Sequence, residues 1–383
     1  MVKTASGLRA VLLIGLVSLL GDFVYEGGRA VLPDYMRQLG MNAFIVGASL
    51  GLAEFAGWAA RPLGGLIADR TGKYSTLVKA GYGGLFVIPL MGFIPVWFMV
   101  VLFAFAERVF RGLRVPPRDA MLVRMRGEVG LGTAFGIHEL MDQVGATAGP
   151  LLAIVVLTLF ASTPLVFISL AIPYAILVAA LAILPSYSEP AREASKLRPS
   201  KPVLLYSAAV ALNCAGLLPL PLVLYMVSYT SGSSSWLVPA AYTVAMIVDA
   251  AAGLVLGRSF DKYGVKVVVS AFLIAVLPPL FIYSPVSLLM VCALLVGVVV
   301  GAQESVFRAV VAQLSEKDGL GNAYAIYGLG IGLGSAAAGL AYGSLIETNT
   351  PVSFMLAYAV AVQAVALLVF FKAVRRHKSA ANT

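Results

Sequence analysis

Long apolar stretches separated by short charged connections run through the whole chain, and this pattern limits the possible fold more than any other feature. A helix needs about 20 mainly apolar residues to cross a bilayer. Backbone groups inside lipid must be hydrogen-bonded within their own segment, so each stretch is expected to be helical. Twelve stretches meet this criterion, at residues 8–36, 42–66, 75–91, 96–117, 131–160, 163–184, 202–229, 235–257, 266–283, 285–311, 320–346 and 351–372.

Composition excludes an ordinary soluble domain. The chain is 60% hydrophobic and 12% charged, which leaves too few charged residues for a solvated surface. The sequence also lacks zinc-ligand spacing, a phosphate-binding loop and a nucleophile elbow, so we expect no metal site, no cofactor and no enzymatic activity. We therefore predict an all-α integral membrane protein with twelve transmembrane helices.

A motif is repeated half a chain apart. Residues 65–73 read Gly-Leu-Ile-Ala-Asp-Arg-Thr-Gly-Lys, and residues 257–265 read Gly-Arg-Ser-Phe-Asp-Lys-Tyr-Gly-Val. A second pair, residues 130–135 and 319–324, recurs at nearly the same spacing. A repeat of this length indicates two homologous halves. We predict a six-helix half at 1–184, a pseudo-symmetric six-helix half at 202–383, and a polar, proline-containing, flexible linker at 185–201.

Basic residues gather in alternate connections. They lie near residues 3–9, 70–79, 118–126, 192–201, 258–266 and 308–317 and in the tail after residue 372, whereas the opposite connections are nearly free of Lys and Arg apart from Arg37. The positive-inside rule then places both termini and the linker in the cytoplasm. The net charge of +9 follows from this bias. We interpret it as contact with anionic lipid rather than with nucleic acid.

Two six-helix halves with this charged motif resemble the major facilitator superfamily over essentially the whole chain. The motif residues lie between the second and third helices, with a weaker copy between the eighth and ninth; they are Gly65, Asp69, Arg70, Gly72 and Lys73, then Asp261 and Gly264. The resemblance implies transport by alternating access, with Asp69 and Arg70 helping to hold the cytoplasmic side closed. The alternative is a charged turn that only sets topology.

The fifth expected helix carries a second signature. Gly136, Gly145, Gly149 and Pro150 resemble the segment that marks the antiporter branch of the superfamily, typically drug/proton exporters. The sequence departs from that pattern where Ala153 and Ile154 replace an expected Gly-Gly. Glycines at such spacing let neighbouring helices approach closely, and a proline bends the helix. The alternative is close helix packing without a role in gating.

Charged residues inside the apolar stretches indicate where function lies, because each costs about 2.5–3.5 kcal/mol at the bilayer centre. Asp22, Glu26 and Arg29 share one helix face, and His138 and Asp142 share another. In the fourth expected helix, Arg108 followed by Gly112 matches a pattern of the superfamily. We expect proton coupling to be carried by four residues, Asp22, Glu26, Arg108 and Asp142. A static Glu26–Arg29 pair that only orients the first helix is the alternative.

Further polar side chains are candidates for a substrate cavity. Those of the first half are Tyr25, Arg29 and Arg111, and those of the second half are Asn213, Gln303 and Glu304. Pro219 and Pro221 indicate a bend in the seventh expected helix, beside Asn213.

The sequence favours a monomeric, proton-coupled antiporter of the cell membrane that exports small organic or amphipathic compounds, with protons and a small molecule as its partners. Three alternatives remain. One is an uptake symporter for an anion, suggested by the arginines of the first half. Another is a divalent metal transporter, with oxygen and imidazole ligands from Asp22, Glu26, His138 and Asp142. The third is a channel or lipid scramblase.

Overall fold

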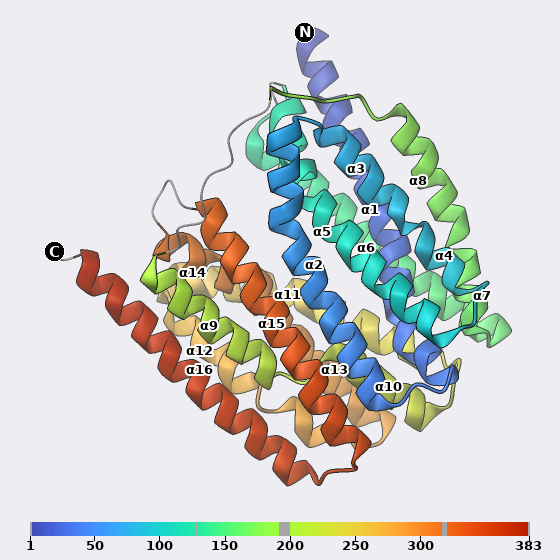
Figure 1. Cartoon of the computed structure of the whole chain (residues 1–383), viewed down its shortest axis with the longest axis vertical. Coiled ribbons are helices and arrows are strands. Elements are labelled where there is room, and N and C mark those ends of the chain that lie inside the picture. Colours follow the sequence, from blue (N-terminus) through green and yellow to red (C-terminus); the bar gives the residue numbers. More distant parts are fainter. Residues whose placement is uncertain (1, 128, 191–199, 316–319, 382–383) are drawn as a thin grey trace. The chain divides into compact units, whose positions relative to one another are not determined.

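The computed structural model describes residues 2–127, 129–190, 200–315 and 320–381, and every regular element in these ranges is helical (Figure 1). The segments before residue 190 are α1 (Val2–Gln38), α2 (Ala43–Thr71), α3 (Tyr74–Gly83), η1 (Gly84–Phe86), α4 (Val87–Met91), α5 (Trp97–Met125), α6 (Leu131–Phe160), α7 (Thr163–Ser169) and α8 (Ala171–Ile183). Those after residue 200 are α9 (Lys201–Gly216), α10 (Leu220–Ser231), α11 (Leu237–Tyr263), α12 (Lys266–Ile274), η2 (Pro278–Phe281), α13 (Val286–Glu304), α14 (Val306–Leu314), α15 (Leu320–Glu347) and α16 (Val352–Ala381). Five of the twelve expected helices are interrupted, so each of them consists of two or three consecutive segments. The all-α fold of twelve helices is confirmed.

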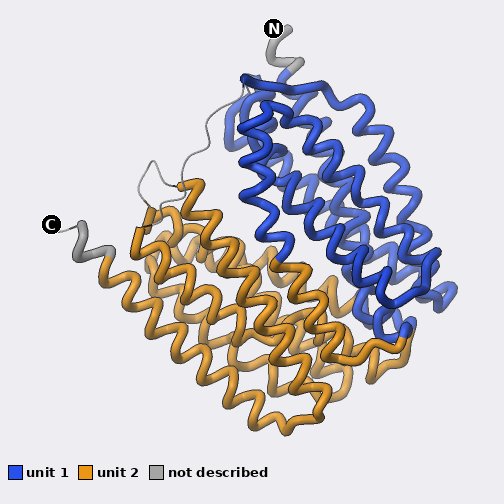
Figure 2. Tube along the Cα trace, in the orientation of Figure 1, with its two compact units in different colours: residues 1–39, 56–195, 234–239 blue, residues 40–55, 196–233, 240–383 orange. Residues whose placement is uncertain are grey.

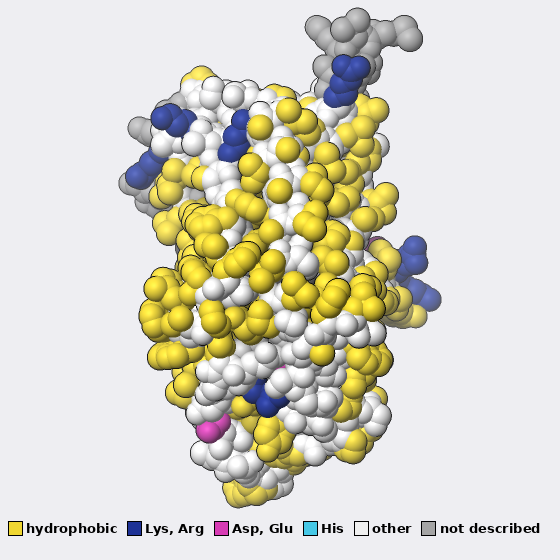
Figure 3. Space-filling model, turned by 90° about the vertical axis from the view of Figure 1, so that its right-hand side faces the viewer, with side chains coloured by type: hydrophobic (Ala, Val, Ile, Leu, Met, Phe, Trp, Pro, Cys, Tyr) yellow, Lys and Arg dark blue, Asp and Glu magenta, His cyan; other side chains and the backbone are white. Residues whose placement is uncertain are grey.

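Nine helical segments within the described ranges are long and apolar enough to cross a membrane. Helix α5 is not among them, because its charged residues, including Glu107, Arg108, Arg111 and Arg114, interrupt its apolar run. On the face of the molecule in Figure 3, hydrophobic side chains cover much of the surface, between uncharged polar side chains and backbone, and Lys and Arg appear in only a few places. Such a surface suits contact with lipid chains.

Contacts divide the chain into two compact units (Figure 2). Unit 1 contains residues 1–39, 56–195 and 234–239, and unit 2 contains residues 40–55, 196–233 and 240–383. Two short segments therefore pack with the unit formed mainly by the other part of the sequence: the first half of α2 joins unit 2, and the segment that leads into α11 joins unit 1.

Unit 1 is built around a close crossing of α1 and α6. A Cβ atom at Gly145 would lie 2.1 Å from the carbonyl oxygen of Leu19, and one at Gly149 would lie 2.3 Å from that of Phe23. Both distances are far below van der Waals contact, so only glycine allows the two backbones to approach this closely. The interval of four residues repeats the contact one helical turn along.

Unit 2 contains the counterpart of this crossing between α9 and α15. A Cβ atom at Gly330 would lie 2.6 Å from the carbonyl oxygen of Ser207, and one at Gly334 would lie 2.2 Å from that of Ala211. The glycine pair again spans four residues. The repeat seen in the charged motif thus recurs in the way the helices pack inside each unit.

The two copies of the charged motif end in the same backbone geometry. Gly72 and Gly264 have φ angles of 68° and 64°, in the left-handed region that glycine adopts at low cost. Each amide donates to the carbonyl four residues earlier, Ala68 or Phe260, and so closes a helix end. The charged turns expected to start at 65 and 257 are therefore shorter, because α2 and α11 continue to within one residue of these glycines.

Interrupted helices release backbone carbonyls, which tyrosine hydroxyls then satisfy. At the break between α9 and α10, Tyr342 donates to Gly216 at 2.8 Å. At the break between α13 and α14, Tyr327 donates to Gln303 at 2.5 Å. Such partners make broken helices tolerable at membrane depth. Prolines predicted the first break, whereas nothing noted in the sequence predicted the second.

The start of the linker is held in place by α2, α3 and α5. The Tyr187 amide donates to Ser75 Oγ at 2.7 Å, and the Glu189 amide donates to the Gly72 carbonyl at 3.0 Å. Arg124 also forms an ion pair with the Glu189 carboxylate. The expectation of a flexible linker is therefore wrong for residues 185–190, because these hydrogen bonds fix them to the helix ends. The basic residues expected at 192–198, together with Gly319 of the second repeat, lie outside the described residues.

Candidate functional site

A cluster of charged side chains lies among three helices of unit 1. It combines carboxylates and guanidinium groups that the sequence places far apart. Helix α1 contributes Asp22, Tyr25, Glu26 and Arg29; α5 contributes Glu107, Arg108, Arg111, Arg114 and Arg118; α6 contributes His138 and Asp142. The glycine crossing of α1 and α6 makes this convergence possible.

Tyr25 lies at the centre of one part of the cluster and is fully buried. Its hydroxyl accepts hydrogen bonds from Nη1 of Arg108 at 2.5 Å and from Nη1 of Arg111 at 2.6 Å. The Arg29 guanidinium also lies 5.0 Å from the centre of the ring. Tyr25 was predicted as a cavity residue. The structure shows that it gathers three guanidinium groups, which its spacing in the sequence did not indicate.

Three arginines of the cluster form ion pairs with carboxylates of α1 and α5. The shortest nitrogen–oxygen distances are 3.6 Å for Arg29–Glu26, 2.8 Å for Arg108–Glu107 and 3.8 Å for Arg114–Asp22. Arg114 is only 1% exposed. A buried guanidinium is stable only when a carboxylate and good hydrogen bonds offset its desolvation, so removal of Asp22 would leave an uncompensated charge.

Asp142 belongs to a neighbouring part of the cluster. Its Oδ2 atom lies 3.5 Å from Nδ1 of His138 and 3.7 Å from Nη1 of Arg118. Arg118 also donates to Ser18 Oγ at 3.1 Å, and Ser18 in turn hydrogen-bonds the hydroxyl of Tyr82 at 2.8 Å. Asp22 and Asp142 were both predicted as proton-coupling residues. In the structure Asp22 pairs with Arg114, whereas Asp142 pairs with Arg118.

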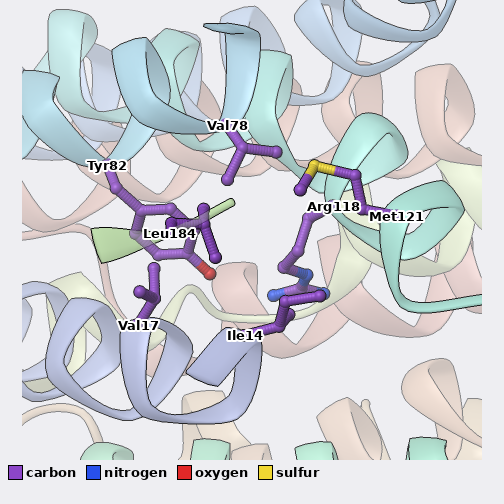
Figure 4. Close-up of a pocket in the computed structure, with 7 residues that line it drawn as sticks. All are labelled: Ile14, Val17, Val78, Tyr82, Arg118, Met121 and Leu184. Carbon is purple, nitrogen blue, oxygen red and sulfur yellow. The ribbon is translucent and has the colours of Figure 1, made fainter. Parts of the chain in front are cut away.

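A small, mainly apolar pocket adjoins this second part of the cluster at Arg118 and Tyr82 (Figure 4). Arg118 and the ring of Tyr82 approach it from α5 and α3. The remaining lining side chains are Ile14, Val17, Val78, Met121 and Leu184. The apolar walls keep the Arg118 guanidinium largely out of water, which strengthens its interaction with Asp142.

The residues proposed as metal ligands do not assemble into a metal site. Within the described ranges, no group of three or more His, Cys, Asp or Glu side chains is placed to hold an ion. His138 and Asp142 pair with each other, whereas Asp22 and Glu26 pair with arginines. The geometry of the described residues therefore gives no support to the divalent-metal alternative.

Two cavity candidates of the second half lie in a closed polar network. Asn213 donates to Gln363 at 3.0 Å, and Gln303 donates to Asn213 at 3.0 Å, all three side chains being buried. The network holds α9, α13 and α16 together, because satisfied buried amides fix their helices. Glu304, at the end of α13, is exposed.

The predicted gating residues lie at helix ends and crossings. Asp69 is in the last turn of α2 and accepts a hydrogen bond from the Tyr74 hydroxyl at 2.7 Å. Gly65 faces Pro116 of α5 at an ordinary contact distance. Pro150 is buried beside Gly149 in α6. Three of these gating candidates, Arg70, Lys73 and Asp261, have exposed side chains.

The model of the Major Facilitator Superfamily matches two overlapping parts of the chain, residues 11–237 and 203–383. Together they span almost all of it. The chain belongs to the major facilitator superfamily. Its members are transporters, so the function is secondary transport of a small molecule and not enzymatic catalysis.

Other proteins resemble the chain to different extents. The uncharacterized protein Rv2265 of Mycobacterium tuberculosis is 30% identical over 387 residues, covering 96% of this chain and 93% of its own. The multidrug resistance protein MdtH of Photorhabdus laumondii is 29% identical over only 122 residues, 31% of this chain and 29% of its own.

Solved structures of the superfamily show the same fold at low identity. A mutant of the nucleoside transporter NupG superposes with a TM-score of 0.77 at 15% identity, covering 94% of this chain and all of its own. A POT family transporter in complex with 5-aminolevulinic acid superposes with a TM-score of 0.72 at 12% identity, covering 97% of this chain and 96% of its own. At such identities the likeness shows the fold alone.

Sequence reasoning missed a polar cluster at the end of α1. The fully buried Asp34 carboxylate accepts hydrogen bonds from Gln38 and from Thr163 Oγ1, both at 2.7 Å. It also accepts the backbone amide of Ser234 at 3.2 Å, which ties the segment before α11 to α1 and α7. The only hint in the sequence was the four-residue spacing of Asp34 and Gln38, which places both on one helix face. It did not indicate the contacts with Thr163 and Ser234.

We predict that Asp34→Ala destabilises the protein by about 1–3 kcal/mol, because it takes the carboxylate acceptor from the buried Thr163 hydroxyl and the partly buried Ser234 amide. Asp34→Asn should cost less, since the amide keeps one oxygen for the Ser234 amide. Thermal unfolding of the purified variants checks this order. Equal stability of Asp34→Ala and the wild type would contradict the structural role assigned to Asp34.

Proposed function

We propose that the chain is a proton-coupled antiporter that exports small organic or amphipathic compounds across the cytoplasmic membrane, with both termini in the cytoplasm. One observation carries the proposal. Ionisable carboxylates of α1 and α6 converge beside a glycine crossing, each within 4 Å of a basic side chain. The resemblance of Gly145, Gly149 and Pro150 to the antiporter segment supports the direction of coupling.

The carboxylates and arginines have complementary roles in this proposal. Asp22 and Glu26 bind and release the proton, and Asp142 does so beside His138. In the deprotonated state Arg114 and Arg29 stabilise the carboxylates, and protonation weakens these pairs. The Asp22–Arg114 pair joins α1 to α5, so its strength can change when one of these helices moves relative to the other. Arg108 acts on the same carboxylates through Tyr25 and Glu107.

The motif glycines and helix ends would provide the movement. Alternating access requires the two ends of the protein to open in turn around a central site. We propose that the turn at Gly72 and its counterpart at Gly264 help to close one end. The glycine contacts of α6 with α1 and of α15 with α9 provide tight surfaces along which helices can shift.

A second candidate is symport of an anion with protons. It is favoured by the charge around Tyr25, where Arg29, Arg108 and Arg111 outnumber the paired carboxylates Glu26 and Glu107. Protonation of a nearby carboxylate would make this region more positive and would strengthen anion binding. Proton and anion would then travel in the same direction.

Internal pH of proteoliposomes tests both candidates. Purified protein is reconstituted with a pH-sensitive dye inside, and drugs, organic cations and organic anions are added outside in turn. Antiport predicts that uptake of a substrate drives protons out of the vesicles. Symport predicts internal acidification by an anion. Substrate uptake that never moves protons would refute proton coupling in either direction.

A further inference from the structure

One arginine of the unit 1 cluster differs from the others in its ion pairing. Arg29, Arg108, Arg114 and Arg118 each have a carboxylate oxygen within 4.0 Å. Within the described residues Arg111 has none at that distance, and its hydrogen bond goes to the neutral hydroxyl of Tyr25. Asp22 and Glu26 attract it only from farther away.

Positive groups gather around Arg111. Its guanidinium carbon lies 4.3 Å from the centre of the Tyr25 ring, and the guanidinium groups of Arg29 and Arg108 lie at 5.0 and 5.1 Å from the same centre. Three positive groups around one ring repel one another. Glu26 and Glu107 form ion pairs with two of them, whereas the third, Arg111, is attracted by Glu26 and Asp22 without an ion pair of its own among the described residues.

This positive region has an accessible edge. Arg111 is only partly buried, and the Arg29 side chain is 25% exposed, whereas Tyr25 and Arg108 are buried beneath them. Arg111 donates one of its five N–H groups to Tyr25, and the planar guanidinium can offer a pair of the others to an oxygen acid. Tyr25 holds the group in place, so little rotamer freedom remains to be lost when a ligand binds.

We propose that Arg111, with Arg29 beside it, binds an anionic oxygen group of the substrate, namely a carboxylate, phosphate or sulfonate. Arg111 supplies a bidentate contact and the main charge, and Arg29 supplies a second positive charge while it remains near Glu26. The neutral parts of the substrate are left to other surfaces of the protein. The inference rests on the transport function proposed above but not on the direction of proton coupling.

Ligand-induced thermal stabilisation of the purified protein in detergent tests this site without any proton gradient. The probes are a matched series on one ring: benzoate, benzenesulfonate and phenyl phosphate as anions, benzamide as the neutral member and benzylamine as the cation. Ionic strength is kept constant. We expect at least one anion to raise the unfolding temperature in a saturable manner, and benzamide and benzylamine to have no such effect.

Variants then assign the effect to Arg111. Arg111→Gln should weaken the apparent affinity for the anion roughly 10- to 100-fold, the range expected for a charged hydrogen bond. Arg111→Lys should bind with intermediate affinity, because it keeps the charge but loses the planar fork, and it serves as the test if the Gln variant does not fold. The matched control is Arg9→Gln, which removes the same charge from an exposed position and should bind as the wild type does.

Several results would overturn the proposal. These are stabilisation by benzamide or benzylamine equal to that by the anions, no stabilisation by any of the three anions, or unchanged anion affinity in both Arg111 variants. Arg111-dependent anion binding without proton movement in vesicles would instead retain the anion site and refute proton coupling. Proton-coupled transport of a cation, with no effect of Arg111→Gln, would retain proton coupling and refute the anion site.

Discussion

Gly145→Ala should destabilise the protein by roughly 1–3 kcal/mol, the usual cost of forcing a methyl group into a packed interface. The new Cβ atom would lie 2.1 Å from the carbonyl oxygen of Leu19. A backbone carbonyl in the middle of α1 cannot turn away as a flexible side chain could. The helices must therefore separate, which also displaces Asp22 of α1 from its partner on α5. Thermal unfolding in detergent measures the loss, and transport should fall with it.

The same helix provides the control. A Cβ atom at Gly136 meets no heavy atom within 4 Å, so Gly136→Ala removes a flexible residue from α6 without a collision. This change should leave stability unchanged or raise it by up to about 1 kcal/mol. Gly334→Ala, at the corresponding crossing in unit 2, should behave as Gly145→Ala does. If Gly145→Ala and Gly136→Ala unfold at the same temperature, the crossing is not as tight as the structure shows.

The fold could be predicted from the sequence because local patterns determine it. Apolar runs long enough to cross a bilayer gave the twelve helices, and Gly72 and Gly264 marked two helix ends through a backbone conformation that favours glycine. Pro219 and Pro221 marked a helix break for an equally local reason. Helix ends were less accurate, since the charged last turns of α2 and α11 were taken as connections.

The partners of polar residues could not be predicted in this way. Spacing placed Asp22, Glu26 and Arg29 on one helix face, but it did not show that Asp22 pairs with Arg114 of α5. Asn213 was expected in a cavity, yet its amide is enclosed by Gln303 and Gln363. Each of these pairings depends on how distant helices cross and rotate, which no single segment encodes. The same limit explains why the Asp34 cluster was missed.

Replacing Asp22 with Asn and Glu26 with Gln together should abolish substrate-dependent proton movement in proteoliposomes. Neither amide can take up or release a proton in the working pH range, whereas both can still accept hydrogen bonds.

The single variants should differ in stability. Arg114 is 1% exposed and would lose its carboxylate in Asp22→Asn, at a cost of about 3 kcal/mol or more. Arg29 is 25% exposed, so Glu26→Gln should cost less.

Glu139→Gln is the matched control for this pair, because it neutralises a carboxylate that lies on α6 next to His138 but is exposed. Its one hydrogen bond partner in the described contacts is Gln143, one turn along the same helix. Proton movement should persist in this variant at the level of the wild type. The compound used is whichever one evokes a pH change with the unmodified protein. Should the double variant transport that compound with its proton flux intact, Asp22 and Glu26 do not carry the proton, and Asp142 beside His138 becomes the group to test.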